Sequence, residues 1–156
     1  MIRACFLACL VLSGCQAVPV EPRPVAGSFV EALNAKNVEA MSRLAGIPFR
    51  YRNQQWESAS DGSGYVLGAA QDRVAGSADE LLTLLRDMTS SVRVEDPAPV
   101  ATPPSKDVLL KETLKGAPSQ WSDMNLVLFR RGEGDVEHVA IVGIDARGKV
   151  VGLYIN

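Results

Sequence analysis

The chain has 156 residues, with 16 basic and 18 acidic side chains and a formal net charge of −2 at pH 7. Hydrophobic residues make up 47% and charged residues 22%, which are ordinary values for one globular domain. This length supports one hydrophobic core and excludes a large multidomain enzyme. Because basic residues are not in excess, we expect no electrostatic nucleic-acid partner.

The first fifteen residues have the layout of a secretory signal. Arg3 precedes the apolar stretch 4–12, which is too short to span a bilayer. Small residues then lead to Cys15, and this Leu-Ser-Gly-Cys ending resembles the lipobox of bacterial lipoproteins. The resemblance implies that residues 1–14 are removed as a signal peptide and that the Cys15 thiol carries lipid chains such as palmitate. The alternative is an ordinary secretory signal, with Cys15 incidental.

The position of Cys15 also bears on redox state and location. Cys5 and Cys9 lie within the predicted signal, so the mature chain would hold no intramolecular disulfide. Two or more lipid chains give a stable membrane anchor. Gln16 follows Cys15, whereas an Asp at that position favours inner-membrane retention in many Gram-negative lipoproteins. We therefore expect a bacterial envelope protein on the periplasmic side of the outer membrane.

The remaining chain divides into a tether and a domain. Residues 15–27 comprise the lipidated cysteine and a proline-containing, semi-extended tether, and residues 28–156 form the domain. The spacing of Ser28 and Glu31 is typical of a capping box, and we expect Asn37 to cap the N-terminus of a second helix. Residues 28–45 are thus predicted to form two consecutive short helices, ending at Gly46 as a left-handed cap.

In residues 47–52, side-chain polarity repeats with a period of two residues, which predicts a strand. Its apolar side chains Ile47, Phe49 and Tyr51 face the core, whereas Arg50 and Arg52 face outward. Ser77 and Glu80 have the capping-box spacing that begins a third helix. We expect, in chain order, a mostly irregular segment 57–76, a helix 79–88, a short strand 92–94, an irregular proline-rich segment 96–105, a strand 108–113, and three antiparallel strands at 125–130, 137–144 and 150–155.

The order of these elements gives an α+β layout with helices on one face of a curved sheet. The helix pair 29–44, the Ile-Pro-Phe-Arg-Tyr segment 47–51, the helix 79–88 and the apolar strands from His138 onward resemble the nuclear transport factor 2-like superfamily. This resemblance implies a cone, in which a curved, mostly antiparallel sheet wraps around about three N-terminal helices and leaves a pocket between them. Members include isomerases, dehydratases and small-ligand binders, so the fold does not choose the function.

His138 is the one histidine of the chain and the candidate catalytic residue. It stands at the start of an apolar strand, beside Asp135 and Glu137. An imidazole titrates near neutral pH and can act as acid or base. The plainer interpretation is a polar residue at a strand end, and no Gly-x-Ser-x-Gly nucleophile motif accompanies it. The scattered carboxylates predict no metal site, and no motif predicts a cofactor.

Large aromatic side chains supply the candidate ligand contacts. These are Phe49, Tyr51, Trp56, Tyr65 and Trp121, for which core packing is the alternative. The first hypothesis is a non-catalytic lipoprotein domain that binds a small apolar ligand or an envelope protein. The second is an isomerase, dehydratase or hydrolase acting through His138 or a pocket carboxylate. A third possibility is a homodimer formed through an exposed sheet face.

Overall fold

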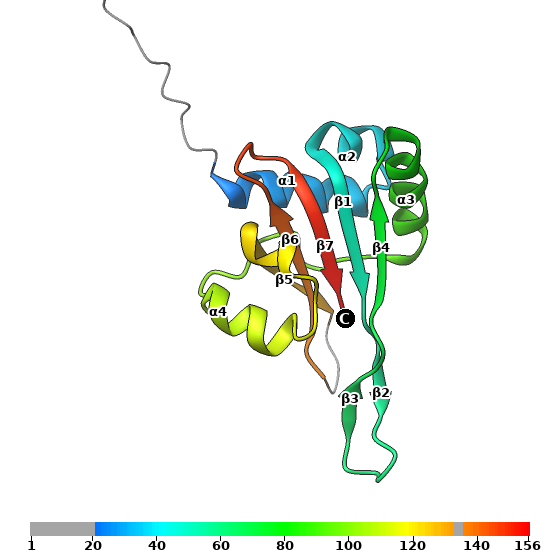
Figure 1. Ribbon diagram of the computed structural model, residues 1–156, viewed down its shortest axis with the longest axis vertical. Helices are drawn as coiled ribbons and strands as arrows, with labels where there is room; N and C mark the ends of the chain where they lie inside the picture. The colour runs from blue at the N-terminus through cyan, green and yellow to red at the C-terminus, as the bar shows by residue number, and fades with distance from the viewer. Residues whose placement is uncertain (1–20, 133–135) are drawn as a thin grey trace, which may run out of the picture.

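The computed structural model describes residues 21–132 and 136–156, so the predicted signal and Cys15 lie outside the described residues. In the described part, the fold is α+β. A mostly antiparallel five-stranded sheet has the strand order β4-β1-β7-β6-β5, and β2 and β3 form a separate two-stranded sheet (Figure 1). The elements are α1 (Pro22–Asn34), α2 (Val38–Leu44), β1 (Ala45–Asn53), β2 (Trp56–Ser58), β3 (Tyr65–Leu67), β4 (Gln71–Ala75), α3 (Ala78–Ser91), α4 (Lys106–Val108), the π-helix η1 (Leu109–Thr113), the 3-10 helix η2 (Ser119–Asp123), β5 (Asn125–Gly132), β6 (His138–Ile144) and β7 (Val150–Ile155).

The first helix begins earlier than the sequence predicted. Residues 22–27 were expected to belong to the tether, but they form the first turns of α1, with Pro22 at its start, where the fixed φ of proline suits a helix. Ser28 therefore lies inside α1 and does not cap it. The cap at Asn37 is confirmed, because its side chain accepts a hydrogen bond from the main-chain nitrogen of Ala40 at 3.0 Å. None of the described helices has the length and apolar content that crossing a membrane requires.

The three C-terminal strands form the predicted antiparallel meander, β5-β6-β7. The first strand then pairs with β7 in parallel, and β4 pairs with the other edge of β1. The segment 57–76, expected to be mostly irregular, contains β3, β4 and most of β2. Gly46 was predicted to end a helix, but it lies within β1. Ile47 was predicted to face the core, but it is exposed, in the part of β1 where the pairing with β7 shifts register. Residues 92–94 are not a strand, and the Asn34 side chain holds the main chain of Val94 instead.

Residues 108–113 were predicted to be a strand and are helical. Ser105 begins this helical segment by accepting a hydrogen bond from the main-chain nitrogen of Val108, at 3.4 Å. The chain then widens into the π-helix η1. Leu109 and Leu114 are buried on the same side of this wider turn. A short apolar run satisfies both helical and strand periods, and here the cap at Ser105 favours the helix.

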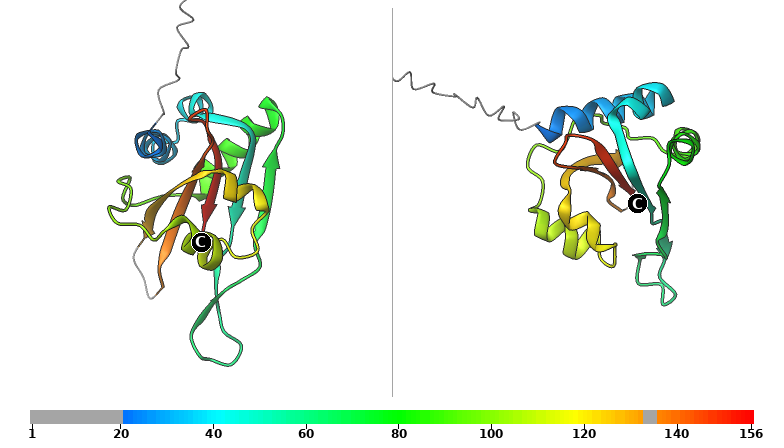
Figure 2. Two further views of the ribbon diagram at one scale, coloured as in Figure 1. Left: turned by 60° about the vertical axis from the view of Figure 1, so that its left-hand side comes forward. Right: turned by 45° about the horizontal axis from the view of Figure 1, so that its top comes forward.

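Both faces of the sheet are covered, whereas the sequence predicted helices on one face alone. The first core lies between α1–α3 and the sheet, and it contains Phe29, Phe49, Phe129 and Leu153. The second core lies between the opposite face and the α4–η2 segment, and it contains Trp121 and Tyr154. Figure 2 shows these two helical layers on opposite sides of the sheet. Hence the central strands carry buried residues at nearly every position.

This second layer explains why Arg52 is not solvent-exposed. Arg52 was expected to point outward from β1, but only 5% of its surface is exposed. Its Nη1 atom donates to Asp72 Oδ2 on β4 at 2.6 Å, and its Nη2 atom donates to the Lys115 carbonyl at 3.5 Å. The face of β1 that was expected to be exposed to solvent is therefore covered by the second layer. A charge buried there must be paired with an opposite charge.

Trp121 fixes this second layer to the sheet. Its indole is 1% exposed and lies over Gly152 of β7 and Gly143 of β6. A Cβ atom on Gly152 would approach Trp121 Cη2 to 3.0 Å and Cζ3 to 3.1 Å. The two glycines thus leave the space that the indole fills.

We expect Gly152→Ala to destabilise the protein by about 1–3 kcal/mol, because the added methyl group overpacks the Trp121 site. Chemical denaturation of both proteins measures the change in the free energy of unfolding. Gly76→Ala is the control, since a Cβ there meets Glu80 Oε2 at an ordinary 3.6 Å. Equal stability of the wild type and Gly152→Ala would contradict this account of the packing.

The predicted capping box of α3 is confirmed, and its hydrogen bonds lead to a second prediction. The Glu80 carboxylate accepts hydrogen bonds from the main-chain nitrogens of Gly76 and Ser77, at 2.7 and 3.0 Å, and these bonds hold its pKa below the ordinary value. The stabilisation from this carboxylate is therefore present above the unfolded-state pKa and is lost as pH falls through the folded-state pKa. We expect Glu80→Gln to lower the free energy of unfolding by more at pH 7 than at pH 3. Denaturation at both pH values checks this, with Glu31→Gln on the exposed side of α1 as the control.

Candidate functional site

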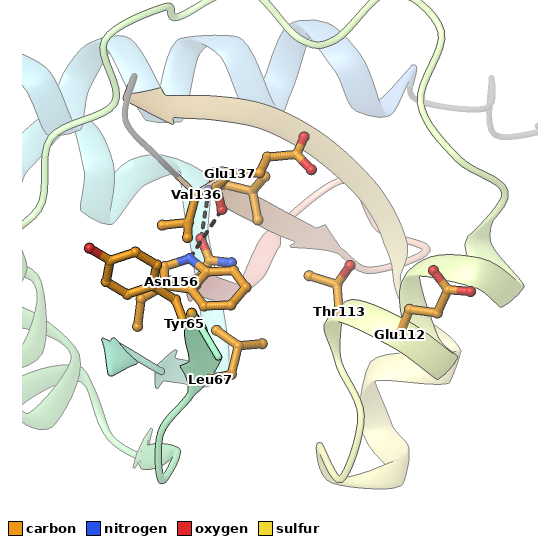
Figure 3. A pocket seen from close by; sticks show the side chains of 10 residues that line it. Tyr65, Leu67, Glu112, Thr113, Val136, Glu137 and Asn156 are labelled. Carbon is orange, nitrogen blue, oxygen red and sulfur yellow. Dashed lines mark hydrogen bonds between the residues drawn. The ribbon is translucent and has the colours of Figure 1, made fainter. Parts of the chain in front are cut away.

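A pocket of about 520 Å³ lies where the two-stranded sheet approaches the ends of β6 and β7. Its first wall is the β2–β3 pair, its second is η1, and its third is the start of β6 together with the residue after β7. Figure 3 shows Tyr65 and Leu67 on one side of this space and Glu112 and Thr113 on the other. The lining residues are Trp56, Gly64, Tyr65, Leu67, Glu112, Thr113, Val136, Glu137, Val139 and Asn156.

Trp56 connects the β2–β3 pair to the body of the protein. Its indole Nε1 atom donates to the main-chain oxygen of Glu137 at 3.2 Å. Gln54, two residues before Trp56, bonds to both parts. Its main-chain nitrogen donates to the Ile155 carbonyl at 2.9 Å, and its side chain donates to the carbonyl of Gly68, directly after β3, at 2.8 Å. The aromatic wall is thus held against the third wall by hydrogen bonds from side chain and main chain.

Several hydrogen bonds hold Asn156 in the wall of the pocket. Its Oδ1 atom accepts from the main-chain nitrogen of Val139 at 2.7 Å, and its own main-chain nitrogen donates to the Val139 carbonyl at 3.2 Å. Its main-chain oxygen accepts from the Arg131 guanidinium and lies 3.5 Å from His138 Nδ1. These bonds join β5, β6 and the end of β7 at the floor of the pocket.

His138 lies beside this network but does not line the pocket. Successive residues of a strand point to opposite faces, and Val139 contributes to the pocket and to the second core. His138 therefore shares the other face with Ala140 and the first core. Among the described residues, the structure pairs no carboxylate with its imidazole. The structure thus places this catalytic candidate away from the pocket.

Arg131 and Tyr51 share a charged neighbourhood at the first core. Burial raises the pKa of Tyr51, and the charges of Arg131 and Arg73 act in the opposite direction. Burial also lowers the pKa of Arg131, against the influence of Tyr51. The Nε atom of Arg131 is buried without a hydrogen-bond partner among the described residues. Neither Tyr51 nor Arg131 lines the pocket.

The structure separates the five predicted aromatic contacts into two groups. Trp56 and Tyr65 line the pocket together, and Tyr65 is 52% exposed. Phe49 belongs to the first core, where its ring lies 6.0 Å from that of Phe29, and Tyr51 is buried in the same core. Trp121 belongs to the second core. For these last three residues, the alternative of core packing is confirmed.

Sequence reasoning missed the second and third walls of the pocket. Glu112 and Thr113 lie on η1, which was predicted to be a strand, so their side chains could not be placed. A π-helix is rare and occurs frequently at functional sites, but it has no simple sequence signature. Glu137 and Asn156 reach the pocket through the pairing of distant strands. Within the described residues, no group of three metal-ligating side chains lies close enough together to hold an ion.

No protein-family model matches this chain, and a search of curated proteins finds no significant match. Function is therefore inferred from the geometry of the pocket and from the sequence features of the chain.

Proposed function

We propose that this protein is a lipid-anchored protein of the bacterial envelope that binds a small, partly apolar ligand without catalysing a reaction. The observation that carries the proposal is the pocket between the β2–β3 pair, η1 and the end of β7. Its volume of about 520 Å³ is within the range of small-molecule sites. Trp56, Tyr65 and Leu67 provide the apolar wall that such sites use for binding.

A non-catalytic role is supported by the position of the titratable groups. Acid–base catalysis requires a group within hydrogen-bond reach of the reacting atoms. His138 belongs to the opposite sheet face, and its described polar contact is the main-chain oxygen of Asn156. The enzyme hypothesis therefore gains no support from His138. A pocket carboxylate would have to be Glu112 or Glu137, and both are solvent-exposed.

The anchor is supported by the sequence and is compatible with the position of α1. Residues 16–21 separate Cys15 from α1 and can extend over about 20 Å at most. In Figure 1, α1 lies at one end of the sheet, and the β2–β3 pair lies at the other. A lipid on Cys15 would hold the α1 end at the membrane and leave the pocket open to the periplasm, with the outer membrane as the proposed location.

The resemblance to the nuclear transport factor 2-like superfamily supports a binding role in more general terms. In support, α1 and α2, then β1, later α3 and finally the meander β5–β7 follow one another in the chain, although β2–β4 and the α4–η2 segment stand between them. In this chain, however, apolar side chains fill the space between α1–α3 and the sheet, including Phe29, Leu33 and Phe49. We therefore place the ligand at the end of the sheet and not within the expected cone.

We place the proposed protein partners on a different surface from the ligand. The second layer covers the sheet face on which a homodimer or an envelope protein was expected to bind. The outer edge of β4 has no strand partner among the described residues, and Val74 there is 53% exposed. Both partners stay predictions, and this edge is their proposed place on the sheet.

Lipidation has a direct test. Cells that express the full chain and grow with labelled palmitate are expected to label the wild type, because Cys15 would supply the acylated thiol. Cys15→Ser should abolish the label, whereas Cys9→Ser should retain it and serve as the control. Detection of labelled protein after electrophoresis gives the result. An unlabelled wild type would refute the anchor.

Ligand binding is tested with the neutral probe N-phenyl-1-naphthylamine, whose fluorescence increases in an apolar site. A chain that begins at Gln16 is suitable, because both cores lie within residues 26–155. We expect saturable binding that Leu67→Asp weakens at least tenfold, since the carboxylate replaces part of the apolar wall. Val66→Asp is the matched control, because Val66 is an exposed neighbour on the same strand that does not line the pocket. Absence of saturable binding to the wild type would refute the binding function.

A further inference from the structure

We infer that the ligand of this pocket is a neutral saccharide; this inference rests on the proposed binding function and names the class of ligand. The aromatic wall supplies the first reason. The indole N–H of Trp56 is bonded to the main-chain oxygen of Glu137, so the carbon surface of the ring is what remains for a ligand. Tyr65 lines the same pocket and is 52% exposed. A pyranose ring has a face of C–H groups, whose weakly positive hydrogens suit the negative face of an aromatic ring.

Asn156 supplies the second reason, because its buried side chain lines the pocket with a hydrogen-bond donor to spare. The residue is 4% exposed, and its Oδ1 atom accepts from the main-chain nitrogen of Val139 at 2.7 Å. This bond fixes the orientation of the amide, since only its oxygen can accept. Burial raises the pKa of Tyr154, and the Arg52 charge and a hydrogen bond from the Asn156 side chain oppose this rise. That bond uses one of the two N–H groups on Nδ2.

The second N–H group has no protein acceptor within the described structure. A buried donor without an acceptor is costly, so an oxygen atom of a ligand would stabilise the site. The Thr113 hydroxyl on η1 lies across the space from Tyr65 and likewise has no hydrogen bond to a described residue (Figure 3). It can both donate and accept. The polar groups of the pocket therefore suit a ligand with several oxygen atoms.

The aromatic and amide contacts are spaced for a single sugar unit. The bond from Trp56 goes to the main-chain oxygen of Glu137. The bond to Asn156 comes from the main-chain nitrogen two residues later, at the second residue of β6. Residues two apart in an extended chain are separated by about 7 Å. A pyranose ring is of similar size, so one ring can cover the indole and present an oxygen to the amide.

The charges around the pocket favour a ligand without net charge. Glu112 and Glu137 are solvent-exposed lining residues and would repel an anion. Beside the floor, the Arg131 guanidinium bonds to the main-chain oxygen of Asn156 and would repel a cation. A neutral saccharide meets neither repulsion. Its hydroxyls and ring oxygens match the amide and the hydroxyl, and its C–H face matches the aromatic wall.

The inference is tested by nuclear magnetic resonance titration of the isotope-labelled chain that begins at Gln16. The probes are the neutral disaccharides N,N′-diacetylchitobiose and cellobiose, with sorbitol as a compound that has hydroxyls but no ring. We expect at least one disaccharide to cause saturable shifts of the Trp56 indole N–H and the Asn156 side-chain amide, and to displace N-phenyl-1-naphthylamine. Sorbitol at the same concentration should do neither.

Two substitutions then locate the disaccharide in the pocket. Asn156→Asp keeps the oxygen that accepts from Val139 but removes the amide donor, so it should weaken disaccharide binding at least fivefold. Asn125→Asp is its matched control, because it makes the same change at an exposed residue outside the pocket. Tyr65→Ala should also weaken binding at least fivefold, and its exposed position preserves the fold. Val66→Ala, on the same strand but outside the pocket, should retain full affinity.

The outcomes separate this inference from the proposed function. Absence of saturable binding by both disaccharides, equal shifts with sorbitol, or full affinity in either Asn156→Asp or Tyr65→Ala would each overturn the saccharide. In those cases, saturable binding of N-phenyl-1-naphthylamine would leave the binding function intact. Failure of that neutral probe to bind the wild type would instead refute the function itself.

Discussion

The parallel pairing of β1 with β7 is the constraint on which both the fold and the pocket depend. Parallel strands end at the same edge of a sheet, so Asn53 lies beside Ile155. The chain that leaves β1 must therefore pass the residue that follows β7, and the Gln54 main chain bonds to Ile155 there. Trp56 comes next and bonds to Glu137. The aromatic wall and the polar floor are thus brought together by one strand pairing.

The cover on the second sheet face follows from the composition of the same strands. In β6 and β7, apolar residues occupy both faces, as in strands that are buried on two sides. Such a sheet requires apolar cover on each side, and α1–α3 cover only one. The α4–η2 segment covers the other with Trp121 and Leu109. Because this cover ends at the pocket, η1 serves both the core and the candidate site.

How much was predictable from the sequence depends on the range of the interactions involved. The capping box at Ser77 and the C-terminal meander are encoded within a few residues, so local spacing was sufficient to predict them. The burial of Arg52 and the second wall at Glu112 depend on a layer whose apolar run fits helix and strand alike. Trp56 and Tyr65 were candidates because they are aromatic, but only the parallel strand pairing brings them beside Asn156. Local chemistry therefore predicted elements and candidate residues, whereas long-range pairing decided which residues share a site.

The position of the pocket follows from how the interior is filled. Burial of large side chains such as Phe29, Phe49 and Trp121 on both sides of the sheet consumes the volume in which a cone would hold a ligand. Side chains at the end of the sheet, such as Glu112 and Glu137, are solvent-exposed and so avoid the free-energy cost of burying a charged group. A site at this end can thus combine charged groups with the half-exposed aromatic wall of Tyr65. A closed apolar interior would exclude that combination, and this is the physical reason for placing the proposed binding site at the end of the sheet.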